Sequence, residues 1–452
     1  MSTPTAEHVH DVVGIGLGPF NLGLACLLDP LDDVDAVFLE ARSELAWHPG
    51  MLLQGATLQT PFLADLVSLA NPTSPLSFLS YLKQTGRLYP FYIRESFFPL
   101  RREFDAYCRW AAGQLRSVRL AQRVESVEYD AADQAYVVHA VRPATGDRST
   151  YRGRRLVLGT GTPPYVPEPL RAQWASGGDV VHSSQYLQAA KSLRRSGSIT
   201  VVGSGQSAAE IYADLLADLP AHDYQLTWLT RSPRFFPLEY TKLTLEMTSP
   251  DYTDYFHALP AETRDGLVRA QRSLYKGINS GLVNEIYDRL YELDLDGPQR
   301  TRLLTNTEVR TCERDGDGRL RLGVEQVEQR RRFEHTTGSL VLATGYRYAA
   351  PAFLDPIRHR IRWDEQGRFA VHRNYSVDVA GDEVFVQNAE LHTHGFVAPD
   401  LGMAAYRNSW LVRSITGREV YPIEQSIAHQ EFGVPRPLDV REPLQDKQEV
   451  PA

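Results

Sequence analysis

Two glycine-rich turns are the features of this sequence whose residue types and spacing point most directly to chemistry. The first lies in HDVVGIGLGPFNLGLACLL, between an expected strand and an expected helix, with Gly14, Gly16, Gly18 and Pro19 at the fingerprint positions. Glycine lets a pyrophosphate approach the bare N–H groups at the positive end of a helix, and proline suits a first helical position. The next expected strand, AVFLE, ends at Glu40, about 20 residues further on, where a carboxylate would bind ribose hydroxyls. Together the strand, helix and acid predict a dinucleotide site.

The second turn repeats this arrangement in SITVVGSGQSAAEIYADLL. Gly203, Gly205 and Ala208 occupy its fingerprint positions, and it too opens an expected helix. The strand that follows, QLTWLTRS, ends with Arg231 in place of an acid. A cation there suits the extra phosphate of NADP better than the free hydroxyl of NAD, although a solvated surface arginine fits the spacing equally well.

Two Rossmann-like dinucleotide-binding domains are required to position these turns, so the expected fold class is α/β, with a small helical substrate domain beside them. Glycine turns also end expected strands at 156–167 and 340–351, which suggests that one nucleotide domain is inserted into the other. The helical segment carries an apolar stripe at Leu282, Ile286, Leu290 and Leu293. The expected ranges are 1–170 and 345–440 for the first dinucleotide domain, 190–235 and 300–345 for the second, 236–300 for the helical domain and 441–452 for a flexible tail.

Composition excludes several classes of protein. The 452 residues carry 48 basic and 56 acidic side chains, and a net charge of −8 argues against a nucleic-acid binder. Neither a basic-then-apolar N-terminal segment nor an apolar run of about 18 residues is present, so export and a membrane span are not expected. The cysteines Cys26, Cys108 and Cys312 are scattered, without a CxxC pair, so a reducing cytoplasm is the expected compartment.

Three classes of protein could use two dinucleotides together. A disulfide reductase requires a redox-active cysteine pair, which this sequence lacks. A monooxygenase requires no protein nucleophile, because a reduced flavin captures oxygen itself and the protein orients and shields it. A non-catalytic redox sensor stays open as an alternative, and polar groups for a second substrate in the flavin pocket would argue against it. The sequence therefore favours a monooxygenase.

Longer motifs resemble the N-hydroxylating flavin monooxygenases of siderophore biosynthesis. In the family's order, they are GIGLGPFNLGLA, AWHPGMLLQGATLQTPFLADLVSLANPTSPLSFLSYL, FPLRREFDAYCRWAA, VVGSGQSAAE, LATGYRYAAP and LHTHGFVAPDLG. A wider fingerprint is matched at Gly178, His182 and Tyr186, but Ser176 replaces its aromatic residue, which fits an N-hydroxylase rather than a Baeyer–Villiger enzyme. The resemblance implies FAD at the first turn, NADPH at the second, and hydroxylation of a primary amine by O2.

The resemblance also assigns residues around the flavin ring. Trp47, His48 and Gln59 match family residues there, with Gln59 facing the active edge of the ring, and Arg101 matches an arginine near the nicotinamide and flavin. Gln59 and Arg101 are the expected catalytic residues, whereas core packing for Trp47 and a loop histidine for His48 are simpler alternatives. The other cofactor contacts implied by the resemblance are Ser204, Gln206, Ser207 and Arg231 for NADPH, and Thr344, Gly345 and Tyr346 of LATGY.

The departures from the family concern the substrate. Members that act on ornithine or lysine resemble FLKDL where this chain has FLADL, so Ala64 stands in place of a lysine that holds the substrate carboxylate. Leu245 and Leu274 fall where ornithine hydroxylases carry two asparagines, although a shift of a few residues in the alignment would remove this correspondence. A buried carboxylate without partners is costly, so a diamine, putrescine or cadaverine, is favoured, and L-lysine or L-ornithine is the alternative.

A diamine keeps a positive charge on its distal nitrogen, so a carboxylate is expected at the far end of the pocket. Glu390 and Asp400 flank LHTHGFVAP and are the candidates, with ordinary surface charge as the equal alternative. Tyr275 is expected to line the same pocket. His392 and His394 lack a third ligand, so no metal site is expected.

The mechanism that the resemblance implies passes through a C4a-hydroperoxyflavin, whose distal oxygen the neutral terminal amine attacks. An amine with a pKa of about 10.4 opposes neutralisation near neutral pH by about 4 kcal/mol, so the rate is expected to rise with pH. Sequence does not choose between putrescine and cadaverine, because one methylene is worth only about 1–3 kcal/mol. Relatives of this kind are often dimers or tetramers, so a homo-oligomer is expected.

Overall fold

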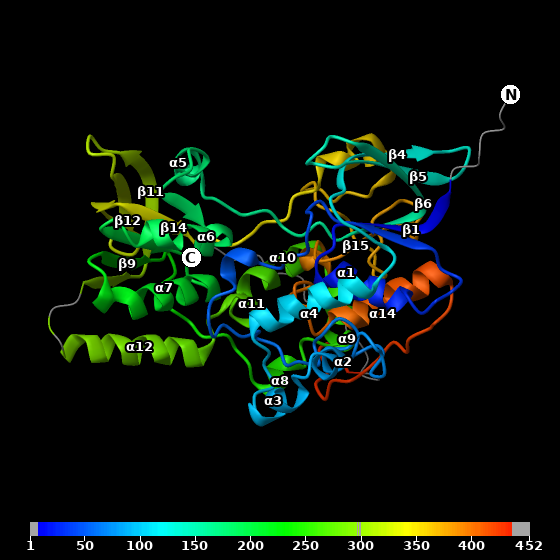
Figure 1. Cartoon of the computed structure of the whole chain (residues 1–452), viewed down its shortest axis with the longest axis horizontal. Coiled ribbons are helices and arrows are strands. Elements are labelled where there is room, and N and C mark those ends of the chain that lie inside the picture. Colours follow the sequence, from blue (N-terminus) through cyan, green and yellow to red (C-terminus); the bar gives the residue numbers. More distant parts are fainter. Residues whose placement is uncertain (1–7, 296, 298–299, 436–452) are drawn as a thin grey trace, which may run out of the picture.

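The apolar run before the first glycine turn forms β1 (Val9–Ile15), a central strand of a seven-stranded sheet in the first of two lobes (Figure 1). This computed structural model describes residues 8–295, 297 and 300–435, and the expected tail 441–452 lies outside them. The strand order is β3-β2-β1-β6-β5-β4, with β15 beside β6. The other strands are β2 (Ala36–Leu39), β3 (Val118–Arg119), β4 (Arg123–Asp130), β5 (Ala135–Val141), β6 (Arg148–Leu158) and β15 (Val384–Val386).

Parallel pairing holds the nucleotide-binding part of this sheet together. β1 pairs in parallel with β2 and β6, and β15 adds in parallel to the far half of β6, so the chain returns to the first sheet after residue 345. β4 and β5 are antiparallel to their neighbours. The helices of this lobe are α1 (Pro19–Leu28), α2 (Phe78–Gln84), α3 (Leu88–Ile93), α4 (Arg101–Gln114), α13 (Leu391–His394) and α14 (Ala404–Thr416). α1 is almost wholly buried because α4 and α14 pack against it.

The second lobe contains a five-stranded parallel sheet with the order β10-β9-β8-β14-β7. A three-stranded antiparallel sheet, β11-β12-β13, lies beside it. The strands are β7 (Val180–His182), β8 (Ser198–Val202), β9 (Gln225–Leu229), β10 (Thr301–Leu304), β11 (Thr307–Arg314), β12 (Leu320–Gln326), β13 (Arg331–Thr337) and β14 (Ser339–Leu342), and the helices are α5 (Arg171–Ala175), α6 (Tyr186–Leu193) and α7 (Gln206–Asp218). β7 thus belongs to this sheet, although it precedes the expected domain range 190–235. The expected α/β class with two dinucleotide-binding domains is confirmed.

The helices of the segment 236–300 divide between the two lobes. Its helices are α8 (Lys242–Leu245), α9 (Pro250–Ala258), α10 (Ala261–Ala270), α11 (Ser273–Lys276) and α12 (Ser280–Leu295). The apolar stripe of α12 packs into the second lobe beneath α7, whereas α9 and α10 pack against α13 of the first lobe (Figure 1). Periodicity predicts such helices, but it does not say which surface each one covers.

Backbone pairing and apolar packing both connect the two lobes. The crossing segments 159–167 and 343–351 pair side by side, with Tyr165 N donating to Gly345 O at 2.9 Å. In addition, the end of the 3₁₀ helix Pro49–Met51 and the loop after it reach the apolar core of the second lobe, where Met51 and Leu53 are buried. The second core is therefore completed by side chains of the first lobe.

Candidate active site

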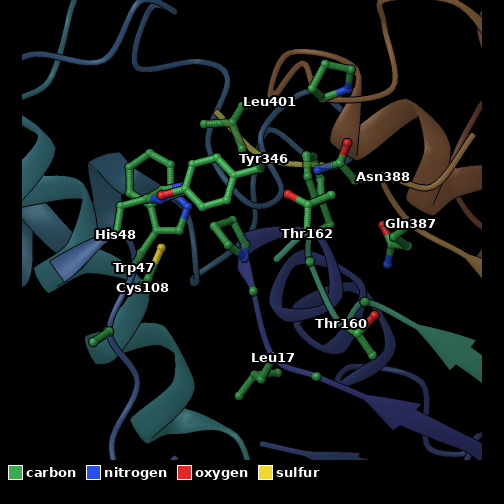
Figure 2. A pocket seen from close by; sticks show the side chains of 18 of the residues that line it. Leu17, Trp47, His48, Cys108, Thr160, Thr162, Tyr346, Gln387, Asn388 and Leu401 are labelled. Atoms are coloured by element: carbon green, nitrogen blue, oxygen red, sulfur yellow. The ribbon is translucent and has the colours of Figure 1, made fainter. Parts of the chain in front are cut away.

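A cavity of about 960 Å³ runs from the first glycine turn to the helices of the segment 236–300. Figure 2 shows His48 and Tyr346 beside each other on one side of this cavity, and Thr160, Gln387 and Asn388 on the other. Strands of the first sheet end at this cavity, and the crossing segments and the chain after β15 run along it. Segments distant in sequence therefore line it together.

The first glycine turn forms one end of the cavity. Gly16 has a positive φ of 86°, and a Cβ there would lie 2.5 Å from Gly159 O. Gly18 precedes α1 with nothing within 4 Å of a Cβ position, and Pro19 is the first residue of the helix. All three line the cavity, whereas Gly14 lies within β1 against the Phe38 ring and serves close packing. The turn therefore leaves glycine backbone without side chains at the start of α1, a position that suits an anion.

Glu40 lies at the end of β2, where the sequence places it, and lines the cavity. Its Oε2 accepts a hydrogen bond from Leu17 N at 3.0 Å, and its Oε1 accepts one from Arg42 N at 3.0 Å. The carboxylate is thereby held at the rim of the glycine turn, in the position typical of a ribose-binding acid.

Two buried polar atoms of the cavity lining have no partner within the described residues. Gln59 Nε2 and Thr60 Oγ1 line the cavity, and neither makes a hydrogen bond within the described part of the chain. Unpaired buried polar groups are costly, so these atoms are suited to a ligand with donors and acceptors of its own. Trp47 is fixed nearby, because its backbone N donates to Asp105 Oδ1 at 2.7 Å.

His48 is a neutral wall residue of the cavity. Burial, reinforced by the positive charges of Arg101 and Arg42, lowers the pKa of His48 to about 4. Its ring centroid lies 6.0 Å from that of Tyr346, whose pKa burial raises. Both aromatic side chains are therefore uncharged at neutral pH.

Arg101 reaches the cavity from the first turn of α4. Its guanidinium makes a bidentate contact with Glu210 of α7, at 2.8 Å for each of the two bonds, and Nη1 donates to Met51 O at 2.9 Å. The expected arginine is thus at the cavity, but it is bound to a residue of the second lobe.

The second glycine turn lies outside this cavity, between β8 and α7. A Cβ on Gly203 would lie 2.2 Å from Ala343 O, and Gly205 caps α7 directly before Gln206 and Ser207. Ser204 lies between the two glycines and, like them, is half-buried. The turn therefore keeps bare backbone at the start of a helix.

Basic side chains lie on the side of this turn that faces α11. Lys276 lies beside it, with its carbonyl oxygen 3.4 Å from a Cβ placed on Gly205, and desolvation together with the charges of Arg272, Arg347 and Arg231 lowers its pKa. Sequence reasoning singled out Arg231 alone of these four residues. Such a cluster suits a ligand with several phosphates.

The last three residues of LATGY, Thr344, Gly345 and Tyr346, have different environments. The Thr344 hydroxyl donates to Tyr165 O at 2.5 Å, and Gly345 has a positive φ of 80° while its carbonyl accepts from His182 Nε2 at 3.0 Å. Tyr346 alone of the three lines the cavity. Thr344 and Gly345 thus fix the crossing segment that presents Tyr346.

The far end of the cavity is apolar with one carboxylate. Tyr275 and Phe396 stack with ring centroids 6.3 Å apart and line it together with Leu274. Asp400 also lines this end, where Gly402 N donates to its Oδ1 at 2.6 Å. Burial raises the pKa of Asp400, and burial and the nearby Asp400 charge together raise the pKa of Tyr240. Tyr240 lies in no motif that could have identified it from sequence, whereas Phe396 lies within LHTHGFVAPDLG but had no role assigned to it.

Three of the expected substrate residues do not reach this space. Ala64 is buried in the first lobe and Leu245 is half-buried on α8, and neither lines the cavity. Glu390 was also expected there and is wrongly placed by sequence reasoning: it is fully buried, accepts a hydrogen bond from Ala389 N at 2.7 Å and pairs with Arg407. Glu390 is therefore paired within the protein, and of the two candidates Asp400 is the one that lines the cavity.

The sequence profile of the L-lysine 6-monooxygenase/L-ornithine 5-monooxygenase family matches residues 8–348. The protein belongs to this family. The expected family resemblance is confirmed, and with it the class of N-hydroxylating monooxygenases.

Individual relatives within this family are similar over nearly the whole chain. The putrescine N-hydroxylase of Shewanella oneidensis is 48% identical over 449 residues, which cover 98% of this chain and 89% of the relative. The FAD-bound crystal structure of DfoA, the cadaverine monooxygenase of the desferrioxamine pathway in Erwinia amylovora, is 53% identical, with a TM-score of 0.93 and coverage of 96% of this chain and 100% of DfoA.

A more distant relative has been solved with both dinucleotides. The Kutzneria ornithine N-hydroxylase KtzI, solved with reduced FAD, NADP+ and L-ornithine, is 30% identical, with a TM-score of 0.83 and coverage of 91% of this chain and 99% of KtzI. Among the described residues of the present protein, none of the helices has the length and apolar character needed to cross a membrane.

Proposed function

We propose that this protein is an FAD- and NADPH-dependent monooxygenase that uses O2 to hydroxylate one terminal amine of an aliphatic diamine, putrescine or cadaverine, for a hydroxamate siderophore. The observation that carries the diamine is the single carboxylate, Asp400, at the end of an otherwise apolar and aromatic chamber. The putrescine and cadaverine hydroxylases among the relatives support the same substrate class.

The residues of the first lobe fit FAD. Gly16, Gly18 and Glu40 would hold its pyrophosphate and ribose, and the unpaired Gln59 Nε2 and Thr60 Oγ1 would meet the polar edge of its ring. When bound, FAD takes a hydride from NADPH and activates O2 for transfer to the amine.

The residues of the second lobe fit NADPH. Gly203 and Gly205 leave the backbone bare before α7, where Gln206 would meet a phosphate. Arg231, Arg272 and Lys276 form a basic cluster that would bind the 2′-phosphate.

The side chains of the far chamber would bind and orient the diamine. Asp400 would accept the distal ammonium, and the stacked Tyr275 and Phe396 rings would favour a cation beside them. The reacting amine must lose its proton at a cost of about 4 kcal/mol at neutral pH. Leu274 and Leu401 line the chamber with apolar surface, which would favour the neutral amine over the ammonium. The neutral His48 adds no repelling charge.

The polar groups of this chamber also distinguish an enzyme from a redox sensor. A sensor without a second substrate would not require Asp400 and Tyr240 next to an apolar chamber, where burial raises the pKa of both groups.

The experiment that tests this function measures hydroxylamine formation, NADPH consumption and hydrogen peroxide with the FAD-loaded protein and four amines: putrescine, cadaverine, lysine and ornithine. Hydroxylated diamine with little amino-acid product supports the proposal. Product mainly from lysine or ornithine would overturn the diamine assignment while keeping the activity. NADPH consumed only to peroxide with all four amines would contradict the substrate class.

The proposal includes a homo-oligomer in a reducing cytoplasm. α3 and the residues after it expose Tyr89, Tyr92, Ile93 and Phe97, which is compatible with a subunit contact. Cys26, Cys108 and Cys312 are all free thiols, as suits a reducing compartment. Light scattering in solution tests the oligomer.

A further inference from the structure

A buried ion pair joins the two lobes at the wall of the cavity. Arg101 on α4 and Glu210 on α7 are 109 positions apart in sequence, and both Nη atoms of the arginine bond to the carboxylate at 2.8 Å. Their side chains are only 12% and 8% exposed. A bidentate contact of this kind fixes the plane of the guanidinium as well as its position.

Glu210 is itself held from a second direction. Gln206 Nε2 donates to Glu210 Oε1 at 2.9 Å, and Gln206 Oε1 accepts from Asn279 N, just before α12, at 2.8 Å. Gln206 is the first residue of α7 and follows Gly205 directly. The carboxylate therefore links the second glycine turn to an arginine that lines the cavity of the first lobe.

We propose that Glu210 is a positioning residue that holds the Arg101 guanidinium at the cavity wall and fixes its position relative to the second glycine turn. This inference rests on the proposed function. Glu210 does not line the cavity, so it acts through Arg101 rather than on a reacting atom. Without the carboxylate, Arg101 keeps its bond to Met51 O but loses the contact that aligns it with α7.

The transfer of a hydride from NADPH to FAD is the step most sensitive to this alignment, because it alone requires groups bound to both lobes to meet. Geometry governs such transfers strongly, and a misplacement of about 1 Å can cost about a hundredfold. Glu210 should therefore affect the limiting rate of flavin reduction, with little effect on diamine affinity.

The first experiment mixes FAD-loaded Glu210→Gln protein with NADPH without oxygen and separates the limiting reduction rate from the NADPH dissociation constant. We expect a limiting rate at least about tenfold lower than in the wild type. The matched control is Glu285→Gln, an exposed carboxylate on α12, which should stay within about twofold. Glu210→Asp, which keeps the charge on a shorter stem, should fall between, and it provides the test if Glu210→Gln fails to fold.

Two further readouts separate positioning from general damage. In Arg101→Lys protein, adding Glu210→Gln should lower the reduction rate little further, because the second residue acts through the first. Without turnover, hydrogen exchange should increase at the start of α4 and the start of α7 in Glu210→Gln but not in Glu285→Gln.

Additive losses in the double variant, or an unchanged reduction rate in both Glu210 variants, would overturn this inference. If wild-type protein oxidises NADPH and hydroxylates a diamine while those results appear, only the role of Glu210 fails. If the wild type does neither, the proposed function fails with it.

Discussion

Arg407 donates a hydrogen bond to Glu390 inside the first lobe, where the two side chains are 2% and 0% exposed. Arg407 Nη1 also donates to Ala398 O at 3.1 Å, and burial raises the pKa of Glu390 while the Arg407 charge opposes that rise. The pair thus braces the loop that leads from α13 to Asp400.

Replacing Glu390 by glutamine should destabilise the fold rather than weaken substrate binding. The change leaves the Arg407 charge buried without its partner, which costs about 3–5 kcal/mol in the free energy of unfolding. Denaturant unfolding of the variant beside Glu285→Gln measures this. A diamine KM that rises while stability stays unchanged would instead return Glu390 to the substrate site.

Replacing Asp400 by asparagine should raise the KM for diamines. Loss of a buried charge partner costs about 2–5 kcal/mol, or at least about thirtyfold in affinity. A primary monoamine of equal length lacks the distal ammonium, so its turnover should change little, and this substrate is the internal control. Equal losses for monoamine and diamine would mean that Asp400 supports the fold instead.

Turnover should rise with pH between about 6 and 9, because the neutral fraction of an amine with a pKa of about 10.4 grows about tenfold per pH unit below that value. His48, with a pKa of about 4, stays neutral throughout and adds no step. Burial raises the pKa of Asp400, so acid removes the ammonium partner and lowers turnover in the same direction. Initial rates of hydroxylamine formation test this, and a flat profile would contradict it.

Replacement by alanine should destabilise the fold at Gly16 but not at Gly18. At Gly16, a positive φ and a backbone oxygen 2.5 Å from the new Cβ force the turn to move, so the FAD-free protein should lose stability. At Gly18, the new methyl group meets no protein atom within 4 Å, so stability should hold while FAD affinity falls. Thermal unfolding without FAD, followed by FAD titration, measures both.

Local spacing predicts the parts of the site that short segments build. The two strand–turn–helix units, the carboxylate of Glu40 and the helical stripe of α12 each depend on residues close in sequence, so motif and period suffice to find them. The ring-side residues Trp47, His48 and Gln59 reach the cavity as the family resemblance implies.

Long-range packing decides the rest. Whether Glu390 or Asp400 faces the cavity depends on Arg407, 17 residues after Glu390, whose side chain pairs with Glu390 and not with Asp400. The pairing of Arg101 with Glu210 spans 109 positions, and no pattern in either segment marks it. Ala64 differs from the family's lysine, yet only the fold shows that it lies away from the cavity.

Met51 and Leu53 couple the unfolding of the two lobes. These side chains leave the first lobe to fill the core of the second, so neither lobe buries all of its apolar surface alone. Heating or denaturant should therefore melt the molecule in a single cooperative transition. A fragment carrying only residues of the second lobe would lack these two side chains. The apolar surface that they cover would be exposed, and the fragment would associate with other chains.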